Sequence, residues 1–204
     1  MAASTASSTI TNEARPGVGP TRVLCLGNEL IADDGLGIVV AAALVTHMEQ
    51  TGSAIPTELA GDPAVTVRAF RVPQVGVVEL VETALTGMYL LESVVKASRL
   101  IVVDSVVTGS AEPGTVLQLR EQDLVGPRGG SPHYIGILET LDLARALGLE
   151  VPDDVLIVAV EAGDYWTVGG AMTELVKAAV PDVVEMVVAL LEGEAAVVHS
   201  ARDG

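Results

Sequence analysis

The sequence predicts a single-domain α/β fold of three layers, in which a mostly parallel, twisted sheet is flanked by helices. First, short apolar runs alternate along the chain with segments of helical length and spacing. Second, half of the 204 residues are hydrophobic and the mean hydropathy is +0.50, which supplies a large core and excludes disorder of the whole chain. Third, with one Trp, three Tyr and one Phe, the core must consist mainly of Val, Ala, Leu and Ile.

The first elements are a strand, a helix and a loop. Residues 22–26 form a short apolar run that ends at Gly27-Asn28, as a buried strand ends at a turn. The segment 35–48 (GLGIVVAAALVTHM) has the length and the apolar face of a helix. Residues 49–63 are polar and contain two prolines, which predicts a loop.

The middle of the chain predicts strands on either side of a helix. Two β-branched runs, at 65–72 and 77–81, are separated by Pro73-Gln74 and predict two strands. Residues 86–97 repeat apolar side chains at helical spacing, and LIVV at 100–103 predicts a buried strand that ends at Asp104.

The remaining elements continue the alternation. A turn at 112–114 precedes a strand at 115–119 (TVLQL), and 127–130 is predicted to be a flexible loop. A helix at 135–147, a strand at 154–160 and a final helix at 171–191 follow, the last one interrupted near Pro181 because proline lacks an N–H. Right-handed crossovers between parallel strands then place helices on both faces of the sheet.

Composition also predicts where the domain begins and ends. Residues 1–20 are rich in Ser, Thr, Gly and Pro without periodicity and predict a disordered leader. The α/β domain is expected over 21–192, and 193–204 is expected to be a flexible tail.

Charge and cysteine content exclude several classes of function. The formal charge of −16 and a pI near 4.3 argue against nucleic acid and against an anionic membrane surface, since both need a cationic footprint. The start of the chain lacks the pattern of a signal peptide, and no apolar run approaches the ~20 residues that span a bilayer. The single cysteine, Cys25, permits no intramolecular disulfide, so a reducing, cytoplasmic location is expected.

Three groups of side chains are expected beyond the carboxyl ends of the strands, where α/β sheets bind ligands. Glu29, Asp33 and Asp34 follow the first strand, Asp104 follows LIVV, and His133 lies in the first turn of a helix that has Ser131-Pro132 at its start. Carboxylates and imidazole together suit a borderline divalent metal. A helix N-terminus also disfavours protonated His133 and keeps its lone pair available.

Each candidate has a purely structural alternative. Asp33 or Asp34 could cap the helix that begins at Gly35, Asp104 could form an Asx turn, and His133 could be an exposed loop residue.

The sequence lacks the motifs of several other classes of enzyme. His47 does not begin an HExxH motif, and no GxSxG or GxGxxG motif occurs. Three carboxylates after the first strand would also repel a dinucleotide pyrophosphate. Cys25 lies in the middle of a predicted strand, which makes it a poor nucleophile.

In order and spacing, three motifs resemble those of the NiFe-hydrogenase maturation endopeptidases. They are GNELIADDGLG at 27–37, LIVVDSVV at 100–107 with EPGTV behind it, and SPHYIGI at 131–137. The resemblance implies a protease that removes a short C-terminal extension from a hydrogenase large-subunit precursor once nickel has been inserted. It also implies a twisted, mostly parallel sheet flanked by helices.

Carried over by position, the resemblance implies that Asp34, Asp104 and His133 are the metal-contacting and catalytic residues. Asp33 and Asn28 would shape the loop, and Gly27 matches the turn glycine. The chain departs from the family pattern at Cys25, where a glycine is common. It departs again at 82–87 (ETALTG), which keeps only an acid and the last glycine of a D-G-G-T-x-G segment beside the family's substrate cleft.

No nucleophile pair of the Ser/His or Cys/His kind is visible, so nickel carried by the precursor, rather than a resident cofactor, is expected to be the recognition element. Hydrolysis would use metal polarisation of the carbonyl or water activated by a carboxylate. Two alternatives remain open: a chaperone that checks nickel without cutting, and an unrelated metal-dependent hydrolase. The sequence leaves the particular hydrogenase, the scissile bond and the oligomeric state open.

Overall fold

Seven strands form one mixed sheet in the order β2-β3-β4-β1-β5-β7-β6 in the computed structural model, which describes residues 19–57, 62–121 and 132–193. For residues 132–135 it describes the backbone alone. The strands are β1 (Thr21–Leu26), β2 (Ser53–Ile55), β3 (Val65–Val72), β4 (Gly76–Thr83), β5 (Arg99–Val106), β6 (Val116–Arg120) and β7 (Asp154–Glu161). The helices are η1 (Asp33–Gly35), α1 (Leu36–Thr51), η2 (Gly87–Leu90), α2 (Leu91–Val94), α3 (Pro132–Ala146) and α4 (Glu174–Leu191), of which η1 and η2 are 3₁₀ turns.

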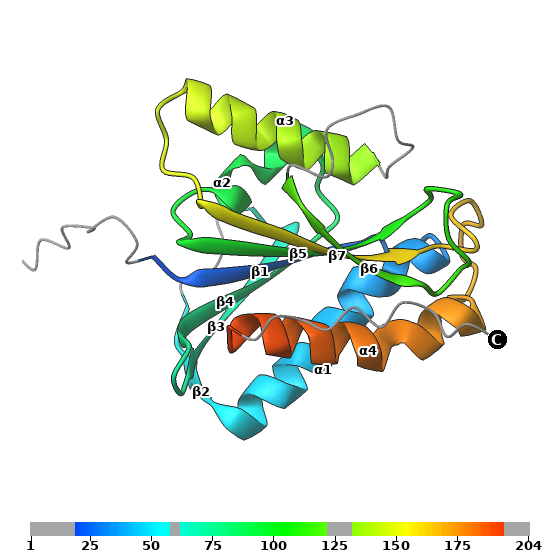
Figure 1. Cartoon of the computed structure of the whole chain (residues 1–204), viewed down its shortest axis with the longest axis horizontal. Coiled ribbons are helices and arrows are strands. Elements are labelled where there is room, and N and C mark those ends of the chain that lie inside the picture. The colour runs from blue at the N-terminus through cyan, green and yellow to red at the C-terminus, as the bar shows by residue number, and fades with distance from the viewer. Residues whose placement is uncertain (1–18, 58–61, 122–131, 194–204) are drawn as a thin grey trace, which may run out of the picture.

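The four central strands, β4, β1, β5 and β7, run parallel. At the edges, β3 pairs antiparallel with β4, β2 with β3, and β6 with β7. Helices α1 and α4 cover one face of the sheet, and α2 and α3 cover the other (Figure 1). The α/β class, the three layers and the single domain are therefore confirmed.

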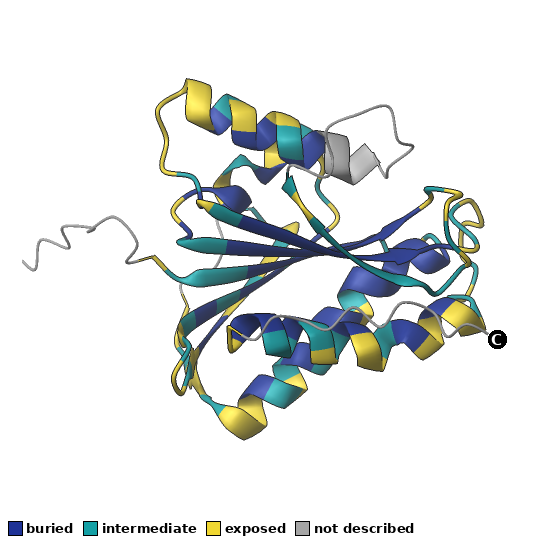
Figure 2. Ribbon diagram, viewed as in Figure 1, coloured by how far each residue is buried: buried dark blue, intermediate teal, exposed yellow. Residues whose placement is uncertain are grey.

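Alternation along the strands divides the core between the two faces. In β1, Val23 and Cys25 pack against α1 and α4, whereas Leu24 and Leu26 pack against the α2/α3 layer. Figure 2 shows β1, β5 and β7 buried along most of their length, because both faces of the sheet are covered there.

The structure corrects the predicted boundaries in three places. The polar segment 49–63 is not all loop, because α1 continues to Thr51 and Ser53–Ile55 pairs with β3 as an edge strand. The predicted helix at 86–97 is only a 3₁₀ turn followed by the short α2, after which Val95 is extended and Lys96 has a φ of 63°. Strand β5 continues to Val106, two residues beyond Asp104.

The last helix also differs from its prediction. It begins at Glu174 and continues through Pro181. Pro181 and Lys177 are exposed, so water can reach the Lys177 carbonyl that lacks its usual N–H partner. The predicted loop at 127–130, nearly all of the leader and the tail beyond Gly193 lie outside the described residues.

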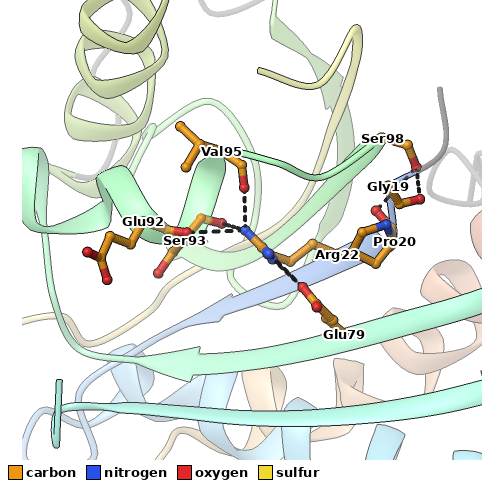
Figure 3. Close-up of polar contacts among 8 residues, drawn as sticks. All are labelled: Gly19, Pro20, Arg22, Glu79, Glu92, Ser93, Val95 and Ser98. Carbon is orange, nitrogen blue, oxygen red and sulfur yellow. Dashed lines mark hydrogen bonds and ion pairs between the residues drawn. The ribbon is translucent and has the colours of Figure 1, made fainter. Parts of the chain in front are cut away.

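Arg22 holds the amino edge of the sheet to the α2 layer (Figure 3). Its Nη1 donates to the carbonyl oxygens of Glu92, Ser93 and Val95 at 3.3, 3.0 and 2.9 Å, at the end of α2. Its Nε and Nη2 donate to Glu79 Oε2 at 3.0 and 2.6 Å. The guanidinium thereby satisfies carbonyls that α2 leaves open at its C-terminus, which is why the short helix can end there.

We expect Arg22→Met to lower the free energy of unfolding by about 3 kcal/mol, because it leaves the half-buried Glu79 carboxylate and three carbonyls without their donor. The urea midpoint measures this loss. As a control, Arg145→Met removes the more exposed ion pair with Glu121 and should cost about 1 kcal/mol or less. Equal losses in the two variants would contradict this role of Arg22.

Candidate active site

Two glycines bring the start of α1 against the end of β1. A Cβ at Gly37 would lie 1.9 Å from the Leu26 carbonyl oxygen, and a Cβ at Gly27 would lie 2.5 Å from the Asp34 carbonyl oxygen. No other residue fits at either position without moving the backbone. The Asn28 N–H then donates to the Asp34 carbonyl at 3.0 Å, and Asn28 Oδ1 accepts from the Leu30 N–H at 3.0 Å. Asn28 thus shapes the turn, as the resemblance implied.

Asp33 ties this turn to the far end of the chain. Its fully buried carboxylate accepts hydrogen bonds from the Gly163 and Asp164 N–H groups at 2.8 and 2.7 Å. It also accepts from Thr173 N–H and Oγ1 at 2.7 and 3.0 Å, and Thr173 is the N-cap residue of α4. Asp33 therefore does not cap the helix that follows it. Its carboxylate fixes the loop between β7 and α4 instead.

Asp34 lies beside that anchor and is 3% exposed. The 3₁₀ turn η1 that carries it lies against β5. Because Cys25 of β1 is in register with Val103 of β5, the end of β1 lies level with Asp104. The structure thus brings the elements that carry Asp34 and Asp104 together at the carboxyl edge of the sheet.

Asp104 lies inside β5 rather than after it. It is fully buried, pairs in register with Ala159 of β7, and accepts the Ser105 N–H on Oδ1 at 2.8 Å. The Asx-turn alternative is therefore wrong, since the strand continues to Val106. Alternation with Val102 and Val106 places Asp104 on the sheet face that α3 covers.

His133 lies in the first turn of α3, which begins at Pro132, as the Ser131-Pro132 motif predicted and three residues before the start expected from periodicity. Its side chain is among those that the structure does not describe. The position of α3 is fixed by Gly136, where a Cβ would lie 2.7 Å from the Gly87 nitrogen, and by Thr140 Oγ1, which donates to the Gly87 carbonyl at 2.8 Å. The divergent segment 82–87 therefore ends directly beneath the helix that carries His133.

Thr83 has taken a structural role within that divergent segment. Its Oγ1 donates to the Ala64 carbonyl at 2.9 Å and accepts from the Leu85 N–H at 3.1 Å. Its carbonyl accepts from the Gly27 N–H at 3.2 Å. The segment remains tied to the turn after β1 although it lacks the first two glycines of the family pattern.

Glu161 is a buried carboxylate that was not among the candidate residues predicted from the sequence. Its oxygens accept from the N–H groups of Thr108 and Gly109, both at 2.8 Å, and from Thr108 Oγ1 at 2.6 Å. It thereby holds the loop after β5 against the end of β7. Its position at the end of an apolar run (DVLIVAVE) was the same signal that identified Asp104.

Cys25 is not available as a nucleophile. Burial raises the pKa of the Cys25 thiol far above its ordinary value, and the Glu82 carboxylate raises it further, so the thiol stays protonated. Among the side chains that the structure describes, no three His, Cys, Asp or Glu are grouped to hold a metal ion; His133 is not among those side chains.

Comparison with known proteins places these features in one family. A sequence profile described as hydrogenase maturation protease matches residues 67–190, which include Asp104 and His133. The chain is 28% identical to the hydrogenase expression/formation protein HupD of Thiocapsa roseopersicina over 80% of this chain and 64% of that one. It is 32% identical to HoxM of Cupriavidus necator, described in the same words, over 52% and 53%.

A solved structure, the hydrogenase maturating endopeptidase HybD from Escherichia coli, shares the fold, with a TM-score of 0.61 and 24% identity over 85% of this chain and 93% of that one. The profile covers more than half of the chain, so the chain belongs to the hydrogenase maturation protease family. It spans 64% and 53% of the length of the HupD and HoxM relatives.

We expect Asp33→Asn to lower the free energy of unfolding by about 2 kcal/mol or more, because an amide NH₂ would face donors that now bond to carboxylate oxygens. Urea unfolding measures the loss, and limited proteolysis should cut the 163–173 loop sooner. Asp182→Asn on the exposed side of α4 is the matched control. Unchanged stability and an uncut loop in Asp33→Asn would rule out the anchoring role.

We also expect the thiol of Cys25 to resist a disulfide reagent in the folded protein at about pH 8, because little thiolate forms there. Denaturant should expose one reactive thiol per chain. Rapid labelling of the native protein would show that the strand does not shield it.

Proposed function

We propose that this chain is an endopeptidase that removes the C-terminal extension of a nickel-loaded NiFe-hydrogenase large-subunit precursor. Membership of the family supports the class of reaction. The observation that carries the proposal is that η1, with the buried Asp34, lies against β5, with the buried Asp104, while His133 lies in the first turn of α3.

The three side chains suit nickel held by the substrate. Carboxylate oxygens and an imidazole nitrogen are donors that a borderline divalent ion accepts. Asp104 lies within a central strand and Asp34 beside the Asp33 anchor, so neither carboxylate must be ordered when the substrate arrives. A precursor without nickel would miss these contacts, which makes the site a checkpoint for metal insertion.

The peptide bond would be cleaved by water. The water oxygen attacks the scissile carbonyl carbon, the C–N bond breaks, and a proton from the water reaches the leaving amine nitrogen. Either the substrate's nickel polarises the carbonyl, or one of the carboxylates takes the proton from the water. The buried, protonated state of Cys25 supports a route without a covalent thioester.

The partner in this proposal is the large-subunit precursor, and the reaction would take place in the cytoplasm. Among the described residues, the helices fall short of the length and apolar character that crossing a bilayer requires.

We expect Asp34→Asn, Asp104→Asn and His133→Ala each to slow precursor processing by at least about 100-fold, because each removes a contact to the substrate's nickel. Mass spectrometry of nickel-loaded precursor before and after incubation measures the loss of the extension. The Asp182→Asn variant, altered at an exposed carboxylate on α4, should process normally.

The same assay separates the two alternatives. If the wild-type chain binds the precursor and leaves its mass unchanged, the chain is a nickel-checking chaperone. If the purified chain alone contains a stoichiometric metal that cleavage requires, it is a metal-dependent hydrolase with a resident ion. Full processing by all three variants would overturn the assignment of the site.

A further inference from the structure

Three large apolar side chains are exposed beside the candidate site. Leu30 is 62% exposed, Trp166 83% and Val168 75%. Backbone contacts bring their two segments together: the Gly169 N–H donates to the Leu30 carbonyl at 2.7 Å, and Ile31 forms an antiparallel bridge with Val168. We call Leu30, Trp166 and Val168 the apolar rim.

The loop that carries Trp166 is held in place from two sides. Asp33 accepts the N–H groups of Gly163 and Asp164, and the Ala32 N–H donates to the Thr167 carbonyl at 3.1 Å. Within the loop, Asp164 Oδ1 accepts the N–H groups of Trp166 and Thr167 at 3.1 and 3.0 Å. An exposed indole on a fixed backbone loses little conformational entropy when a partner covers it.

The apolar rim adjoins the residues proposed to act on substrate. Leu30 precedes Asp34 by four residues in the same tight turn, and the loop of Trp166 is bonded to Asp33. In Figure 1 the start of α1 and the loop before α4 lie at one edge of the sheet. A polypeptide that reaches Asp34 can therefore contact the rim.

The negative charges around the rim indicate which kind of polypeptide segment binds to it. Glu29 is exposed next to Leu30, and hydrogen bonds from the Thr167 side chain and from the Trp166 and Thr167 N–H groups lower the pKa of Asp164, which keeps it ionised. The whole chain carries −16, so a basic segment is attracted to this edge.

A second copy of the chain fits the rim poorly. Two copies would bring the same negative charge together, and three side chains offer on the order of 300 Å² against the ~800 Å² per partner of a stable interface. A transient contact with a substrate needs only a small aromatic anchor.

We propose that the apolar rim docks an apolar segment of the substrate polypeptide that has lysine or arginine beside it. This inference rests on the proposed function, since it assigns the rim to the same precursor. Trp166 would enter an apolar surface of the precursor, while Glu29 and Asp164 would face its basic side chains.

The test measures binding and processing of the nickel-loaded large-subunit precursor separately. We expect Trp166→Ala to raise both Kd and KM by roughly 10- to 30-fold, with Val168→Ser and Leu30→Ala having smaller effects in the same direction. The kcat should stay within about twofold, because the rim touches no reacting atom. For the wild type, raising the salt concentration should raise KM as well.

The matched control is Leu147→Ala, which removes a leucine of 60% exposure just beyond the end of α3. In Figure 1 the end of α3 and the loop before α4 lie at opposite ends of the molecule. All four variants should keep the unfolding temperature of the wild type, because the side chains are exposed.

The outcomes distinguish the two proposals. If the wild type binds without cleaving and Trp166→Ala weakens binding, docking stands and the protease assignment falls. If the rim variants bind and process as Leu147→Ala does, the docking surface is wrong while the protease assignment stands. A wild-type dimer in sedimentation that Trp166→Ala dissociates would assign the rim to a second copy and overturn the inference.

Discussion

The buried carboxylate of Asp33 is the interaction on which the carboxyl edge depends. Four donors from the loop after β7 and from the start of α4 converge on it. Because backbone N–H groups supply three of these bonds, the negative charge is stabilised without a cation. One side chain thus fixes the neighbouring Asp34, the loop of Trp166 and the first turn of α4.

Backbone N–H groups also stabilise other buried carboxylates in this acidic domain. Glu161 is bonded to the N–H groups of Thr108 and Gly109, and Asp104 to that of Ser105. At the opposite edge, the carbonyls that end α2 are bonded by the guanidinium of Arg22. The loops after the parallel strands present N–H donors at the carboxyl edge of the sheet, and the buried carboxylates lie there. The other acidic side chains of the domain remain at the surface.

Much of this fold could be predicted from the sequence, because β1, β5 and β7 are apolar runs, and the packed helices on both faces of the sheet bury them. The edge strand β2 could not, because its three residues are exposed or half-buried and become a strand only by pairing with β3. The candidate residues were visible as acids at strand ends. The role of Asp33 was not, since its partners lie some 130 residues further along the chain.

The sheet order also constrains how the molecule is made. Among the described strands, β6 pairs with β7 alone, although residues 121–153 separate them in the chain. During synthesis on the ribosome, β6 therefore cannot pair until β7 has been made, and the loop that Asp33 anchors emerges later still. The candidate site is completed only after this long non-local closure, so a nascent or truncated chain that ends before Thr173 lacks two of the four hydrogen bonds to Asp33.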